Sequence, residues 1–160
     1  GKMSVPSLFL IVLLMFIGAA PGGTGGGVKV TTAGVIVMSL VAQLRGRSGV
    51  QIFRRSVSSE CVAKAMAVVF IAALWYAVTV WTLTVTEAAA FLAIVFEVGS
   101  ALGTVGLSMG LTPELSAPGK IIILLTMLVG RIGPLGIGLS LIQQRKSGTH
   151  QYAPGEVLVG

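Results

Sequence analysis

The sequence predicts an all-α integral membrane fold, and three observations support that prediction. Apolar residues make up 54% of the 160 residues and charged residues only 10%, with a mean hydropathy of +0.97, whereas soluble domains carry about 25% charged residues. The eleven lysines and arginines flank apolar stretches, a pattern typical of membrane topology and not of nucleic-acid binding. The segment 65–86 has no charged residue and exceeds the about 20 residues that cross a bilayer.

The first 44 residues predict a transmembrane helix that is broken in its middle. The apolar run 5–17 is too short to cross about 30 Å of hydrocarbon at about 1.5 Å per residue. The segment 18–27 contains six glycines and a proline and cannot stay helical, and a helical pattern resumes over 28–44. Such a break is tolerated only where it lines a water-filled cavity or is buried in protein.

We interpret this glycine-rich segment as an intramembrane gating loop, with a flexible helix kink as the alternative. Lys29 follows the loop and is expected to pair with an acidic side chain or with backbone carbonyls. The residues assigned to the gate are Gly18, Pro21, Gly22, Gly23, Thr24, Gly25, Gly26, Gly27 and Lys29.

The basic residues predict how the chain is oriented in the membrane. The connection 45–64 contains five basic residues and one glutamate, so the positive-inside rule places it in the cytoplasm. The tail 143–160, with Arg145 and Lys146, is placed on the same side. We therefore expect a multi-pass protein of the plasma membrane, surrounded by lipid, with a cytoplasmic tail.

Residues 65–142 predict a complete pore module. Between two spans lies a helix-forming stretch that is too short to cross the bilayer, so we expect it to enter the membrane and turn back. The predicted parts are a helix over 65–86, a pore helix over 88–102, a filter over 103–108 and a helix over 119–142.

An internal repeat extends this prediction. Residues 3–18 align without gaps on residues 115–130, with six of sixteen positions identical, among them Ser4 and Ser116. The predicted fold is therefore a series of helix–pore loop–helix repeats. The shift between the two segments implies an equivalent pore loop before residue 1.

The predicted filter resembles the Thr-Val-Gly signature of potassium filters. Its chemistry needs consecutive backbone carbonyls that replace the ion's hydration shell, and a glycine permits a turn that a Cβ would hinder. The negative end of the preceding helix dipole would favour a cation. The alternative is an ordinary extracellular turn. The predicted filter residues are Thr104, Val105, Gly106 and Leu107, with K⁺ at the carbonyls of the first three.

Two charged residues lie within apolar segments. Arg131 is in the middle of the last span and should face protein or a water-filled pore, because a lipid-facing charge is costly. We interpret it as a fixed positive charge below the filter, with a salt bridge to Glu97 as the alternative. Glu97 is expected to accept hydrogen bonds from filter amides and not to bind the ion.

Residues for catalysis are scarce. Cys61 and His150 are the only cysteine and histidine, so no intrachain disulfide or metal cluster is expected. The membrane region contains no nucleophile–base pair. The sequence therefore predicts a protein that is not an enzyme and has no bound cofactor.

Three motifs in order give the chain a resemblance to the Trk/Ktr/HKT superfamily of potassium transporters. Met15–Lys29 resembles the segment after that family's third filter, and Ser100–Ser108 with Gly130–Leu135 resembles the fourth filter and its following helix. Tyr152–Gly160 is similar to the C-terminus of Ktr-type subunits. The resemblance implies the end of a third repeat and a complete fourth, as in the C-terminal part of a Ktr/Trk-type membrane subunit.

This resemblance implies potassium uptake through a four-repeat pore. Gly106 would be the fourth filter glycine, Gly18 to Lys29 the gate and Arg131 the pore arginine. It also implies homodimers and a cytoplasmic nucleotide-binding regulatory ring, and it leaves Na⁺ coupling open. The alternative is a non-conducting membrane scaffold or assembly subunit, for which changing Gly106 would have no functional effect.

Overall fold

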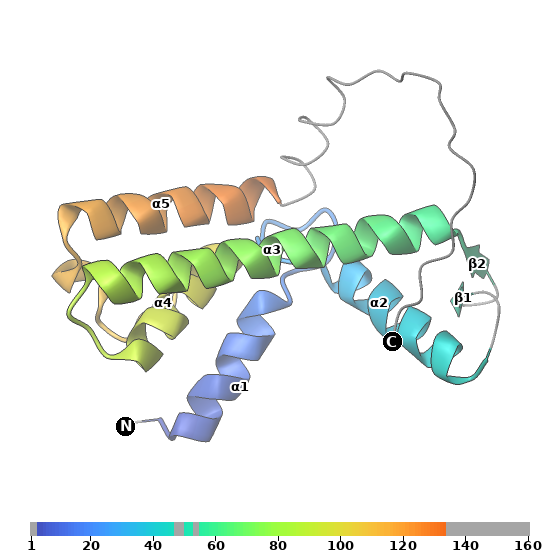
Figure 1. Cartoon of the computed structure of the whole chain (residues 1–160), viewed down its shortest axis with the longest axis horizontal. Coiled ribbons are helices and arrows are strands. Elements are labelled where there is room, and N and C mark those ends of the chain that lie inside the picture. Colours follow the sequence, from blue (N-terminus) through green and yellow to red (C-terminus); the bar gives the residue numbers. More distant parts are fainter. Residues whose placement is uncertain (1–2, 47–49, 53–54, 134–160) are drawn as a thin grey trace, which may run out of the picture.

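The computed structural model describes residues 3–46, 50–52 and 55–133. The end of the predicted helix 119–142, the predicted tail 143–160 and His150 lie outside the described residues. The elements, in chain order, are α1 (Val5–Phe16), α2 (Val30–Leu44), β1 (Val50–Ile52), β2 (Arg55–Val57), α3 (Ser59–Thr86), α4 (Phe91–Gly103), the short 3₁₀ helix η1 (Thr112–Glu114) and α5 (Ala117–Ile132) (Figure 1).

The N-terminal part of the chain leaves the helical conformation at Ile17 and resumes it at Val30. The two ends of the intervening loop meet, because the Gly18 N–H donates to the Val28 carbonyl (2.6 Å) and the Val28 N–H donates to the Phe16 carbonyl (3.2 Å). From this junction α1 and α2 run in different directions (Figure 1). The glycine-rich segment is therefore a loop whose two ends are hydrogen-bonded to each other.

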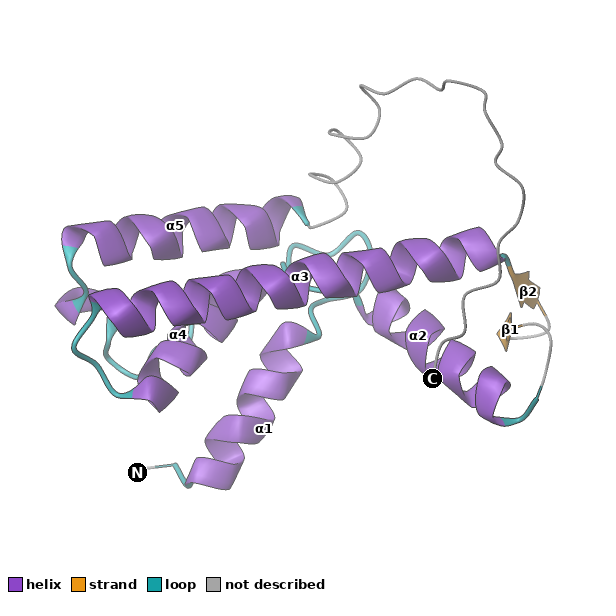
Figure 2. Ribbon diagram, in the orientation of Figure 1, coloured by secondary structure: helices purple, strands orange, loops and turns teal. Residues whose placement is uncertain are grey.

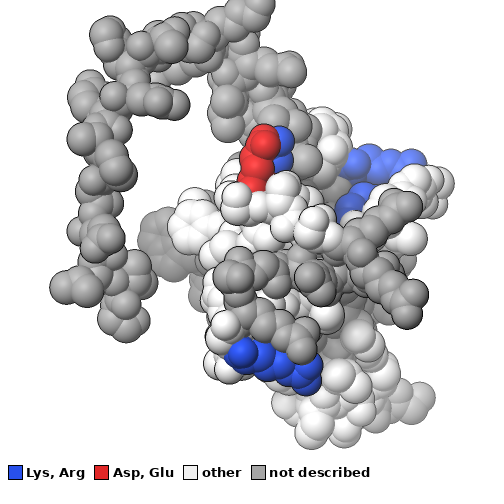
Figure 3. Space-filling model, turned by 90° about the vertical axis from the view of Figure 1, so that its right-hand side faces the viewer, with Lys and Arg blue, Asp and Glu red and all other residues white. Residues whose placement is uncertain are grey.

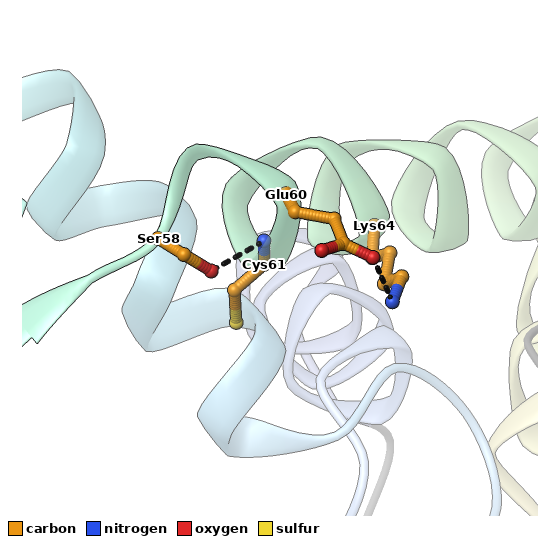
Figure 4. A network of polar contacts seen from close by, with 4 residues as sticks. All are labelled: Ser58, Glu60, Cys61 and Lys64. Atoms are coloured by element: carbon orange, nitrogen blue, oxygen red, sulfur yellow. Dashed lines mark hydrogen bonds and ion pairs between the residues drawn. The ribbon is translucent and has the colours of Figure 1, made fainter.

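α3 is the long helix around which the other elements are arranged (Figure 2). In the part of the chain that the structure describes, it alone is long and apolar enough to cross a membrane. It begins at Ser59, earlier than the expected residue 65, because the Ser58 hydroxyl accepts from the Cys61 N–H (3.3 Å) and caps the helix. Glu60 and Lys64 form an ion pair (2.6 Å) one turn apart on the helix surface (Figure 4).

α4 is short and deeply buried. It packs against α1, α3 and α5, and its residues 96–103 are all buried. Leu83, Ile94 and Val98 are among the core residues between α3 and α4, and Met15 and Phe96 belong to a second cluster between α1 and α4. The arrangement encloses an apolar helix that could not by itself cross a bilayer.

The helices α1 and α5 begin in the same way. The Ser4 hydroxyl accepts from the Ser7 N–H (3.4 Å), and the Ser116 hydroxyl accepts from the Gly119 N–H (3.2 Å). Each helix has a proline in its first turn, where a missing N–H has little cost. The matched sequence segments thus share a capping structure, although α5 continues through Gly130 and α1 ends before Gly18.

The connection 45–64 contains the one departure from an all-α architecture in the described residues. β1 and β2 form an antiparallel hairpin in which Val50 pairs with Val57. The hairpin was not predicted from the sequence, although the segment contains the β-branched residues Val50, Ile52 and Val57, which favour strands. Seen from that end of the molecule, most of the visible described surface is uncharged, and the charged side chains form separate groups (Figure 3).

Glu87 connects the end of α3 to the start of α5. Its carboxylate accepts hydrogen bonds from the N–H (3.0 Å) and the hydroxyl of Ser116. These bonds stabilise the ionised form, and the backbone N–H of Ser116 is the main reason that the pKa of Glu87 is lowered.

We expect this contact to make stability depend on pH. Because the folded-state pKa is lowered, the contribution is present above about pH 4.3, the ordinary glutamate value, and is lost as pH falls through the lowered pKa. Thermal unfolding midpoints of the full-length protein in detergent, measured over acidic pH, should fall more steeply in wild type than in Glu87→Gln. Equal slopes would contradict this role.

Candidate functional site

The segment after α4 has an unusual backbone. Thr104 adopts φ +52°, the only positive φ of a non-glycine residue in the described residues, and Gly106 adopts φ +80°. The N–H groups of Thr104 and Val105 donate to the carbonyls of Ala101 (3.1 Å) and Ser100 (2.9 Å) in α4. The helix therefore holds the start of this segment, and Gly106 has a conformation that L side chains rarely adopt.

The carbonyl groups of residues 104–107 are the second feature of this segment. Across residues 3–46, 50–52 and 55–133, no hydrogen bond is made to the carbonyl oxygens of residues 104–107. Val105 and Leu107 are about half exposed (45% and 50%). A run of unpaired carbonyl oxygens directly after a buried helix is suited to binding a partly dehydrated cation.

The glycine-rich loop contacts this segment directly. The Gly26 N–H donates to the Thr104 hydroxyl (2.8 Å), and the Gly27 N–H donates to the Gly130 carbonyl of α5 (3.2 Å). A Cβ on Gly26 would lie 2.8 Å from the Gly130 oxygen and 2.9 Å from the Leu102 oxygen. Only glycine allows the loop to come this close to α4 and α5.

Two cationic side chains hold the loop's carbonyls. The Arg131 guanidinium donates to the Thr24 carbonyl, and the Lys29 ammonium donates to the Gly25 carbonyl (2.6 Å). Of the two partners expected for Lys29, the structure shows the backbone carbonyl. Arg131 is placed here by the close contact of Gly130 with Leu102, where an added Cβ would overlap the Leu102 carbonyl.

Glu97 has different partners from those expected. Its carboxylate accepts from the hydroxyls of Ser108 (2.8 Å) and Thr112, and it makes neither the ion pair with Arg131 nor the hydrogen bonds to filter amides that the sequence suggested. Lys64–Glu60 is the sole ion pair among the described residues. The expectation was wrong because it considered charge alone. The hydroxyl of Ser108, the last residue of the predicted filter range 103–108, and the hydroxyl of Thr112 satisfy the carboxylate.

Comparison with known proteins decides the family. Residues 2–149 match the profile of TrkH, described as a cation transport protein. The chain belongs to the TrkH family. This confirms the resemblance drawn from the three sequence motifs.

Relatives of this TrkH-family chain are named for ion uptake. It is 46% identical to the Ktr system potassium uptake protein B of Bacillus subtilis, over 100% of this chain and 36% of the relative. Identity to the protein of the same name from Vibrio alginolyticus is 39% over 99% of this chain and 35% of the relative. The potassium/sodium uptake protein NtpJ of Enterococcus hirae is 34% identical over 99% and 37%. The chain spans about a third of the length of these relatives.

The structure brings together only part of the predicted site. Thr104, the second half of the loop and Arg131 lie in contact. The tip of the loop is exposed and consists of Pro21, Gly22 and Gly23. It forms a turn in which the Gly23 N–H donates to the Ala20 carbonyl (3.0 Å). Sequence reasoning gave no site role to Thr112. It placed Leu102, Ser108 and Gly130 in the predicted pore helix, filter and repeat but did not foresee the contacts that they make.

Proposed function

We propose that this TrkH-family chain supplies part of the ion pathway of a potassium-uptake transporter. The observation that supports this most directly is the run of carbonyl oxygens at residues 104–107, which accept no hydrogen bond within the described part of the chain. K⁺ would pass along the carbonyls of Thr104, Val105 and Gly106, which replace its water ligands. The names of the relatives support potassium as the transported ion. One relative is named for uptake of potassium and sodium, so Na⁺ is the competing ion to measure.

The helix before this segment favours a cation at the same place. α4 ends at Gly103 with its C-terminus directly before the segment. Its residues 96–103 are buried, so water screens the partial negative charge of its last carbonyls less than at an exposed helix end. We infer that α4 is a pore helix between the spanning helix α3 and the predicted span 119–142, of which α5 is the described part, in one of a series of helix–pore loop–helix repeats.

The glycine-rich loop is suited to act as a gate. Its residues Gly26 and Gly27 are buried against Thr104 and Gly130, whereas its tip is exposed. Few bonds hold it, and six glycines give it little conformational preference of its own. Within the described part of the chain, a regulator that displaced the loop would need to break the contacts that Gly26 and Gly27 make with Thr104 and Gly130, and the bond from Arg131 to the Thr24 carbonyl.

The surface of the described helices fits a larger membrane assembly. Large apolar side chains such as Phe9, Leu13, Leu124 and Leu128 are at least half exposed, which suits contact with lipid or with further transmembrane segments. We propose a homodimeric, multi-pass protein of the plasma membrane, with a cytoplasmic nucleotide-binding ring as its regulator.

The direct test is ion flux through the purified full-length protein in proteoliposomes. We expect K⁺ to move down its gradient and Na⁺ to compete weakly. Well-incorporated protein that passes neither ion, with or without a K⁺ gradient, would contradict conduction and favour the scaffold alternative.

Arg131→Gln is expected to raise K⁺ flux. The substitution removes the charge that repels cations near the filter and weakens the bond to the Thr24 carbonyl. We expect K⁺ flux to rise by at least about fivefold, the lower end of the range typical when one site shifts the open–closed equilibrium of another. Flux per assembled protein in proteoliposomes is the measurement, and Lys120→Gln, which removes a charge from the opposite end of α5, is the control. Reduced assembly with normal flux per assembled protein would instead assign Arg131 a structural role.

A further inference from the structure

Glu97 is a buried carboxylate that neither the proposed ion pathway nor the proposed gate uses. It lies in the middle of α4 and is 5% exposed. One carboxylate oxygen accepts from the Ser108 hydroxyl (2.8 Å) and the other accepts from the Thr112 hydroxyl. The Ser108 hydroxyl oxygen in turn accepts from the Gly110 N–H (3.0 Å).

This network has a fixed direction. The Ser108 and Thr112 hydroxyls each donate their single proton to an oxygen of the Glu97 carboxylate. The Ser108 oxygen is then left to accept from the backbone of Gly110. Bonds to a charged acceptor are stronger than neutral ones, and a buried charge without partners is costly. The chain from Ser108 to Thr112 is therefore firmly attached to α4.

The attachment lies on the far side of the proposed filter. On the near side, the N–H groups of Thr104 and Val105 are bonded to the carbonyls of α4. Between the two attachments, residues 105–107 are exposed, and an added Cβ on Gly106 would meet nothing within 4 Å. The filter segment is therefore attached to α4 at both ends. The first attachment is made by the backbone of Thr104 and Val105, and the second by Glu97.

We propose that Glu97 is a positioning residue for ion selection: through Ser108 and Thr112 it fixes the far end of the filter segment and thereby the spacing of its carbonyls. This inference rests on the proposed function, because it assumes that those carbonyls bind the ion. Selection between K⁺ and Na⁺ depends on the size of the carbonyl site and on the number and field strength of its ligands. A segment released at one end can close around the smaller ion.

The test compares two substitutions of Thr112 in the full-length protein. Thr112→Val keeps the shape and removes the hydroxyl, whereas Thr112→Ser keeps the hydroxyl. We expect Thr112→Val to lower the K⁺/Na⁺ flux ratio by about tenfold, as loss of one bond to a charged group would, and Thr112→Ser to keep it near the wild-type ratio. Glu97→Gln should lower the ratio as well, with unchanged protein per liposome.

Glu87→Gln is the matched control. It also removes a carboxylate that accepts from a serine hydroxyl, but that serine caps α5 and is not attached to the filter segment. We expect it to leave the flux ratio unchanged.

Three outcomes would overturn the inference. They are an unchanged ratio in Thr112→Val, an equal loss of ratio in Thr112→Ser, and loss of assembly in Thr112→Val, which would make the network a requirement of folding. Gly106→Ser, measured in parallel, separates the two proposals. If it changes the ratio and the Glu97 and Thr112 variants do not, the inference alone fails. If none of them changes the ratio, the proposed function fails.

Discussion

Gly106→Ser is expected to reduce discrimination of K⁺ over Na⁺ by about tenfold or more while leaving expression intact. Gly106 adopts φ +80°, where a residue with a side chain is destabilised by about 1–2 kcal/mol. An added Cβ meets nothing within 4 Å, so the substitution creates no collision. The strain is relieved by rotation of the backbone, which redirects the neighbouring carbonyls that we propose as ion ligands.

The measurement is uptake of both ions by cells that lack other K⁺-uptake systems. Gly46→Ser is the matched control, because Gly46 also has a positive φ (+63°) and open space around it but lies at the end of α2, far along the chain from the filter. Unchanged K⁺ affinity and Na⁺ exclusion in Gly106→Ser would count decisively against a filter.

Gly26→Ala is expected to raise basal K⁺ flux by about tenfold or more, the population shift that about 1.4 kcal/mol produces. The new methyl group would lie 2.8 Å from the Gly130 oxygen and 2.8 Å from the Thr104 methyl carbon. Overpacking of this kind costs about 1–3 kcal/mol. The loop can avoid the collision by moving away from Thr104 and Gly130, and that movement would open the pathway.

Gly34→Ala is the control for the added methyl group, because Gly34 lies within α2 and a Cβ there meets nothing within 4 Å. Flux per assembled protein is compared between the two variants. If Gly26→Ala does not assemble, Lys29→Met removes the bond to the Gly25 carbonyl without adding a collision and should also raise flux. Unchanged or lower flux in correctly assembled protein would show that the loop is structural and not a barrier.

Local patterns in the sequence predicted most of the helices. The apolar run 65–86 lies within α3, and the short stretch before the Thr-Val-Gly motif corresponds to α4 within three residues at its start and one at its end. These predictions succeed because helix formation depends on neighbouring residues and on caps such as Ser4 and Ser116. The start of α3 was placed six residues late, because the first turns of a helix tolerate charged residues such as Glu60.

The sequence by itself determined that this is a membrane chain with a glycine-broken N-terminal segment and a short helix before a filter-like motif, since these features depend on composition and short-range order. Only the tertiary structure decided which groups meet. Gly26 and Thr104 are 78 positions apart, and Thr24 and Arg131 are 107 apart. Their contacts depend on how closely α5 approaches α4 at Gly130. Glu97 shows the same limit: its charge was plain in the sequence, but its two hydroxyl partners follow from the return path of the chain after Gly106. A buried polar group takes the partner that folding brings within about 3 Å, and sequence spacing does not state that distance.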